Sequence, residues 1–169
     1  MVEVIPNFHP LLVHFPIALI SVSVFFHLIA RLMRNRPQFA PHCAVLAHAT
    51  LWLGALAAIP TALLGWLASG SVNHDEAGHA AMLLHRAWAL STLLVLTLLA
   101  GLDAWRHKVN AAPTWPFSVA VILAWALVAS TAWYGAELVY RHGLGVIALP
   151  APSVGAGHTH QHDESAHTH

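Results

Sequence analysis

Four long apolar stretches are the feature of this sequence that most limits its fold. They run over residues 11–33, 44–68, 80–102 and 117–140, and each is close to the roughly 20 residues that a helix needs to cross the hydrocarbon core of a bilayer. Of the 169 residues, 57% are hydrophobic and 8% are charged, whereas a soluble domain carries about 25% charged residues. The sequence therefore predicts an all-α integral membrane protein, a bundle of four transmembrane helices that has the lipid bilayer as its solvent.

The composition also excludes several classes of function. The formal net charge is zero with histidine neutral, which argues against a nucleic-acid partner. A single cysteine, Cys43, excludes an internal disulfide framework. We find no pairing of nucleophile and base and no phosphate-binding loop, so we expect no independent catalytic activity. The fifteen histidines outnumber both the seven acidic and the seven basic residues, and this excess indicates imidazole chemistry in a membrane.

The basic residues favour one side of the membrane. Five of them flank the first-to-second and third-to-fourth connections: Arg31, Arg34, Arg36, Arg106 and Lys108. The other side has two, Arg86 and Arg141. Basic loops stay in the cytoplasm, so we predict a protein of the bacterial inner (cytoplasmic) membrane whose two termini are outside, in the periplasm. Residues 1–149 form the four-helix membrane domain in this interpretation.

Alternate threading of the four spans gathers polar side chains on the side of the termini. They are His9 and His14 of the motif HPLLVHFP, followed by His74, His79, His85, Glu137, Tyr140 and His142. An unpaired polar group near hydrocarbon costs several kcal/mol, roughly 2–7, so His14 and His85 need a polar partner or a metal. For His74, His79 and His142, an interfacial residue without a further role is an equally good interpretation.

The first and third spans run parallel in this threading, and His14 and His85 each lie a few residues inside their span. We therefore predict that these two side chains are the axial ligands of one haem b near the outer face. Arg86 would pair with a haem propionate, and His9 and His142 are the alternative ligands. The competing interpretation is that neutral imidazoles at positions 14 and 85 only form hydrogen bonds to Glu137 or to the backbone.

Two further features leave alternatives open. Glu137 lies four residues before Arg141, so it either forms a helical ion pair or accepts a hydrogen bond from a ligating imidazole. His27 and His48 lie at similar depth in the other half of the membrane and could pair or bind a second cofactor. His14 and His27 point roughly 140° apart around a helix axis, which argues against a second cofactor.

The composition changes after Leu149, and residues 150–169 form a linker and a His-rich tail that we place in the periplasm. Its candidate metal ligands are His158, His160, His162, Asp163, His167 and His169. Imidazole and carboxylate groups bind Zn, Cu or Ni, so we expect a divalent transition metal there. The alternative is a weakly chelating tail without a fixed site.

Four segments resemble a bacterial family of predicted membrane proteins with a domain of unknown function. They are HPLLVHFPIAL in the first span, Gly65–Trp66, His85–Arg86 and GAELVYRHGLGV at the end of the fourth span, so the likeness covers residues 9–146. Members of that family are sometimes joined to cytochrome c domains, which implies a redox setting. The resemblance singles out six positions: His9, His14, His85, Glu137, Tyr140 and His142. His27 and His48 are not part of its pattern.

Three functions agree with these observations. The first is a b-type cytochrome-like protein that transfers electrons in a membrane redox system, with a quinone or a periplasmic cytochrome as its partner. The second is a Cu-, Zn- or Ni-binding membrane protein that uses the His-rich tail. The third is an accessory structural subunit that associates with other membrane subunits in a larger complex. A haem spectrum separates the first from the other two.

Overall fold

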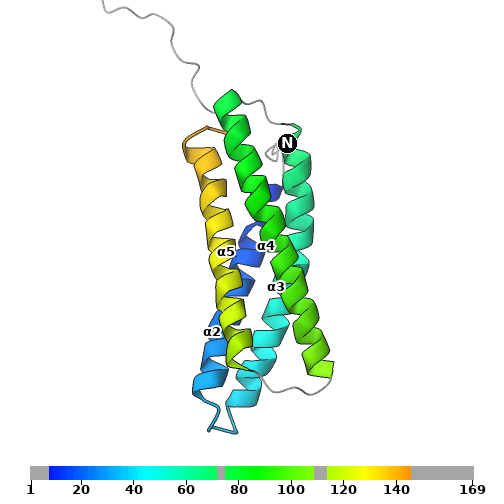
Figure 1. Ribbon diagram of the computed structural model, residues 1–169, viewed down its shortest axis with the longest axis vertical. Helices are drawn as coiled ribbons and strands as arrows, with labels where there is room; N and C mark the ends of the chain where they lie inside the picture. The colour runs from blue at the N-terminus through cyan, green and yellow to red at the C-terminus, as the bar shows by residue number, and fades with distance from the viewer. Residues whose placement is uncertain (1–7, 72–74, 109–113, 146–169) are drawn as a thin grey trace, which may run out of the picture.

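The computed structural model describes residues 8–71, 75–108 and 114–145. The helices in these ranges are α1 (His9–Leu12), α2 (His14–Leu32), α3 (Ala40–Ser69), α4 (Glu76–Lys108) and α5 (Trp115–Tyr140). The described residues contain no strand. Figure 1 shows the four long helices running up and down side by side, so that the start of α4 and the ends of α3 and α5 lie at one end. The predicted all-α four-helix fold is confirmed.

The helices have the length and surface of membrane spans. Four candidate spans cover His9–Leu32, Ala40–Ser69, Glu76–His107 and Trp115–Tyr140 in the described part of the chain. These four spans include every residue of the four apolar stretches predicted from the sequence except Met33, which directly follows the first span. Between 17% and 28% of the most apolar window of each span is buried, so most of each window is at least partly exposed on the outside of the bundle. Such a surface requires an apolar solvent, because water would penalise every exposed apolar side chain.

A break at Val13 separates the first helical turn, α1, from α2. Pro16 has no N–H to donate to the carbonyl oxygen of Leu12, which lies four residues earlier. The hydroxyl of Thr61, on α3, lies 3.4 Å from that oxygen. The helix is interrupted at Val13, whose backbone stays close to helical values at φ −58° and ψ −27°. The proline therefore produces a local bend rather than a loop.

Each long helix packs against the next along the chain, and α5 returns to pack against α2. The core that they enclose includes Ile20, Leu51, Leu96 and Val121, all at most 1% exposed. A close approach of α2 and α3 involves Gly54 of α3, where an added Cβ would lie 2.6 Å from Cδ1 of Ile20. Small residues allow membrane helices to approach closely, and Gly54 has this effect between α3 and α2.

Two glycines end α5. Gly143 and Gly145 have φ angles of +60° and +80°, which a residue without Cβ adopts at no steric cost. The N–H groups of Gly143 and Leu144 donate to the carbonyl oxygens of Val139 and Leu138, so the last carbonyls of the helix are satisfied. The helix α5 therefore ends within the GAELVYRHGLGV segment.

Candidate functional site

A cavity of about 480 Å³ lies in the half of the bundle where α1 begins. Its polar lining consists of His9, His14, His85, Thr61, Thr92, Thr131 and Tyr140. The rest of the lining is mainly apolar and includes Val13, Ile17, Leu93, Leu96 and Val128. We call it the His9–His85 cavity. It contains three of the histidines that the threading argument predicted to share one end of the bundle.

The imidazoles of His9 and His85 face each other across the bundle from α1 and α4. Their ring centroids are 6.4 Å apart and their planes are inclined by 75°. Nδ1 of His9 lies 2.9 Å from the carbonyl oxygen of Thr61. A carbonyl oxygen can only accept, so Nδ1 carries the proton and Nε2 keeps its lone pair. Nδ1 of His85 is buried and has no hydrogen-bond partner among the described residues.

Two glycines on neighbouring helices leave room for these imidazoles. A Cβ built on Gly65 would lie 2.8 Å from Cε1 of His9, and one built on Gly135 would lie 3.1 Å from Cε1 of His85. At Gly65 an added Cβ would force the ring of His9 to shift, because real Cβ atoms essentially never approach within 3.0 Å, whereas at Gly135 the ring of His85 would have to give by a few tenths of an ångström. Gly65 belongs to the Gly–Trp pair and Gly135 begins the GAELVYRHGLGV segment, so the structure explains both motifs by the position of a histidine.

The other residues predicted for this site are arranged less closely. His14 lines the cavity, but its ring is exposed and Nδ1 lies 3.4 Å from the carbonyl oxygen of Leu11. The ring that contacts His85 is that of His9. The guanidinium carbon of Arg86 lies 3.8 Å from the ring centroid of Trp66. A guanidinium over an indole face is a cation–π contact.

At the end of α5, Glu137 forms the helical ion pair that its spacing allowed. Its carboxylate lies 3.0 Å from the guanidinium of Arg141, four residues later. Tyr140 lines the cavity although 87% of its surface is exposed, and His142 follows the helix half-buried. His74 and the predicted ligands of the tail lie outside the described residues.

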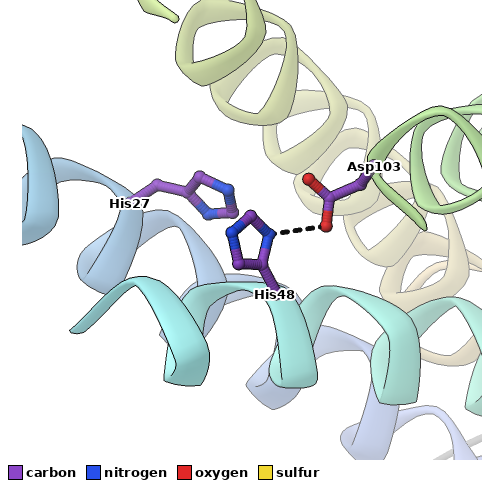
Figure 2. Close-up of side chains that lie close together, drawn as sticks. All are labelled: His27, His48 and Asp103. Atoms are coloured by element: carbon purple, nitrogen blue, oxygen red, sulfur yellow. Dashed lines mark hydrogen bonds and ion pairs between the residues drawn. The ribbon is translucent and has the colours of Figure 1, made fainter. Parts of the chain in front are cut away.

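A second group of polar side chains lies in the half of the bundle farther from His9. It consists of His27 from α2, His48 from α3 and Asp103 from α4, and each offers a nitrogen or oxygen atom within 4.8 Å of those of the other two. Nδ1 of His48 lies 2.7 Å from Oδ2 of Asp103. Figure 2 shows the three side chains converging from their helices. We call this group the His27–His48–Asp103 cluster; by its donor atoms it could hold a metal ion.

His27 and Asp103 of the cluster are buried, His48 is partly exposed, and hydrogen bonds organise part of the group. His27 is 3% exposed and Asp103 is 1% exposed. Nδ1 of His27 lies 2.9 Å from the carbonyl oxygen of Ser23, and the Ser23 hydroxyl donates to the carbonyl oxygen of Ala47. Nε2 of His27 is buried and has no hydrogen-bond partner in the part of the chain that the structure describes.

Sequence reasoning placed His27 and His48 at similar depth and did not include Asp103. A signal for Asp103 exists in the sequence, because a carboxylate at the end of an apolar stretch shares its depth with His27 and His48 once the spans alternate. The angle of roughly 140° between His14 and His27 was the argument against a second cofactor. It does not apply to this cluster, because the other two members come from α3 and α4 and not from the helix of His14. His107, one turn after Asp103, is exposed, and its ring centroid lies 5.4 Å from that of His48.

Comparison with known proteins gives one match. A family model described as "Predicted membrane protein (DUF2231)" covers residues 6–148, which include the whole stretch over which the sequence resembled a family of predicted membrane proteins. No curated protein and no solved structure matches the chain.

Proposed function

The chain belongs to the DUF2231 family of predicted membrane proteins, and from that premise we propose that it is a b-type cytochrome-like protein of the bacterial inner membrane that holds one haem in the His9–His85 cavity. The observation that carries this proposal is the pair of imidazoles whose centroids are 6.4 Å apart within the cavity. A haem in this position would supply one-electron chemistry, and the protein would supply ligands and surroundings.

The separation of the two rings would allow His9 and His85 to hold one haem iron between them. A metal ion about 2 Å from one nitrogen of each of two opposite imidazoles would separate the ring centroids by about 6 Å. The inclination of 75° is compatible with this, because each ring can rotate about the axis between the nitrogen and the metal. Nε2 of His9 is free to ligate, since Nδ1 donates to Thr61. That hydrogen bond also orients the ring, as partners of ligating histidines do.

The rest of the cavity suits the body and the rim of a porphyrin. A volume of about 480 Å³ lies within the roughly 300–1,000 Å³ of typical ligand pockets. Its apolar lining would keep water from a bound macrocycle, and Arg86 near the same end of the bundle could pair with a propionate. Arg86 contacts Trp66 through its guanidinium face, which leaves the N–H groups at the guanidinium edge for a carboxylate.

The side of the membrane that the cavity faces determines which class of redox partner can exchange electrons with it. The turn with Arg34 and Arg36 lies at the opposite end of the bundle from the start of α1, and basic connections favour the cytoplasm. The His9–His85 cavity is then near the periplasmic face, with both termini on the same side. A periplasmic cytochrome or a membrane quinone is the class of partner that reaches this position.

Haem binding is tested on the full chain, expressed with ample haem supply and purified in detergent. We expect a reduced-minus-oxidised spectrum of a low-spin b-type haem and about one haem per chain, as two imidazole ligands predict. His9→Ala and His85→Ala should each abolish the low-spin spectrum. The matched control is His79→Ala, an exposed histidine on the same helix as His85, which should retain it.

The same experiment distinguishes the competing explanations. Loss of the low-spin spectrum in His14→Ala, with retention in His9→Ala, would restore the pair predicted from the sequence. Wild-type protein without haem would contradict the proposal, and an accessory structural subunit of a larger membrane complex would take its place. Metal binding by His158, His160, His162, Asp163, His167 and His169 stays a separate prediction.

A further inference from the structure

We propose that the His27–His48–Asp103 cluster binds one divalent first-row transition-metal ion, with Zn²⁺ as the reference ion. This site is independent of the proposed haem. It draws its residues from α2, α3 and α4, so the bound ion would join three of the four long helices in the half of the bundle farther from His9.

His27 supplies the strongest observation. Its side chain is 3% exposed, and Nδ1 lies 2.9 Å from the carbonyl oxygen of Ser23. Because this oxygen can only accept, Nδ1 carries the proton and Nε2 has the lone pair. Nε2 is buried without a hydrogen-bond partner among the described residues. Buried polar atoms normally have a partner, and an exception calls for an explanation; a metal ion would provide one.

His48 is prepared as a second ligand by Asp103. Nδ1 of His48 donates to Oδ2 of Asp103 over 2.7 Å, so in the neutral imidazole Nε2 again has the lone pair. Figure 2 shows this second nitrogen on the side of the ring that faces His27. A carboxylate that holds the far nitrogen of an imidazole is the usual outer partner of a metal-bound histidine.

The distances suit a single shared ion. The ring centroids of His27 and His48 are 5.8 Å apart, and two imidazoles on one tetrahedral Zn²⁺ would have centroids about 5 Å apart. One nitrogen or oxygen atom of each of the three residues lies within 4.8 Å of those of the other two, so a small movement of the side chains would complete the site. Burying the positive charge of a metal ion costs free energy, and the negative charge of Asp103 beside the ion would offset that cost.

The donor set also indicates which ions are favoured. Imidazole and carboxylate suit Zn²⁺, Ni²⁺ and Cu²⁺, whereas Cu⁺ prefers sulfur ligands. A hydrogen-bonded His–Asp pair without metal would explain the arrangement of His48 and Asp103. It would not explain why Nε2 of His27 is buried without a hydrogen-bond partner among the described residues. This observation therefore favours a metal site over a purely structural contact.

The test uses the full chain with the five tail histidines, His158, His160, His162, His167 and His169, replaced by serine to remove competing ligands. After equilibrium dialysis against Zn²⁺, we expect about one ion per chain and an unfolding temperature several degrees higher, since an ion that binds only the folded state stabilises it. The parent chain with its tail intact shows how much Zn²⁺ the tail adds.

Two substitutions change the cluster while conserving its hydrogen bonds. His27→Asn retains an N–H donor near the Ser23 carbonyl and removes the lone pair of Nε2, so it should weaken Zn²⁺ binding at least tenfold. Asp103→Asn retains an acceptor for His48 and removes the charge, and it should weaken binding about 10–100-fold. The matched control is His42→Asn on α3. Nδ1 of His42 lies 3.0 Å from the carbonyl oxygen of Gln38, four residues earlier as with His27, but its side chain is exposed.

The outcomes separate this site from the haem. Tight Zn²⁺ binding that is lost in His27→Asn and Asp103→Asn and kept in His42→Asn supports the proposal, whatever the haem content. Absence of stoichiometric Zn²⁺ in the tail-substituted chain, or equal affinity in His27→Asn and His42→Asn, would overturn it. If His27→Asn does not fold, as judged by size-exclusion chromatography, Asp103→Asn alone decides.

Discussion

Three of the histidines in the two sites have Nδ1 held by an acceptor, and in each case this determines which nitrogen is free. The acceptors are the Thr61 carbonyl for His9, the Ser23 carbonyl for His27 and the Asp103 carboxylate for His48. In the neutral rings of these three histidines the lone pair is therefore on Nε2. Sequence spacing does not reveal this, because each acceptor is selected by side-chain orientation.

The contact between Gly65 and His9 predicts how haem binding responds when a single methyl group is added by Gly65→Ala. Gly65→Ala would place Cβ 2.8 Å from Cε1 of His9, so the ring must move away from the Thr61 carbonyl. We expect haem affinity to fall about tenfold or more, as for loss of an outer partner of a metal ligand. Spectral titration with haem measures this effect.

Gly101→Ala is the control for Gly65→Ala. Gly101 also lies in a long helix, but an added Cβ meets nothing within 4 Å. This substitution should leave the haem spectrum unchanged and raise stability by up to about 1 kcal/mol through helix propensity. Equal haem affinity in the two variants would contradict the role of Gly65 as space for the His9 ring.

Among the helices, α2 and α3 form a tightly packed pair, and their approach depends on Gly54. The atoms that a Cβ at this position would meet are Cδ1 and Cγ1 of Ile20 and Cβ of Leu19. Ile20 is completely buried and has no open space into which to move. The same pair of helices holds His27 and His48, so this packing also sets the distance between the two imidazoles.

We predict that Gly54→Val separates α2 from α3 and destabilises the bundle by about 1–3 kcal/mol, the usual cost of overpacking. Thermal unfolding in detergent measures the effect. Gly101→Val serves as the control because it makes the same residue change in open space on α4. An unfolding temperature of Gly54→Val equal to that of the control would show that the approach of the two helices tolerates a larger residue.

At the scale of the whole molecule, the two sites lie in opposite halves of one bundle. Their placement relative to the cell follows from the charge difference between the two ends, with five basic residues at one end and two at the other. Reversal of the protein in the membrane would put the His9–His85 cavity on the cytoplasmic side and would remove a periplasmic cytochrome as partner.

Orientation is tested with single cysteines in a Cys43→Ser background. Asn35 lies in the exposed turn before α3, and Ser71 is exposed just after α3 at the other end. An impermeant maleimide should label Ser71→Cys in intact cells and Asn35→Cys only after permeabilisation, since basic connections are retained in the cytoplasm. The opposite labelling pattern would reverse the orientation that we propose.

The sequence by itself determined the class of the protein and the number and approximate bounds of its spans. These depend on local quantities: each stretch must be long enough to cross hydrocarbon, and in lipid its backbone must satisfy its own hydrogen bonds. Alternate threading of such stretches also determined that His9, His14 and His85 share one end. These inferences need only the order of residues along the chain.

Only the tertiary structure decided which side chains meet. His9 reaches His85 because the chain bends at Val13 and because Gly65 and Gly135 leave space for the two rings. Asp103 reaches His48, 55 residues away, because α3 and α4 present these residues to each other. Packing against neighbours that are distant in sequence sets the rotation of a helix about its axis. Residues at the same depth therefore share a site only when their helices turn them toward the same part of the bundle interior.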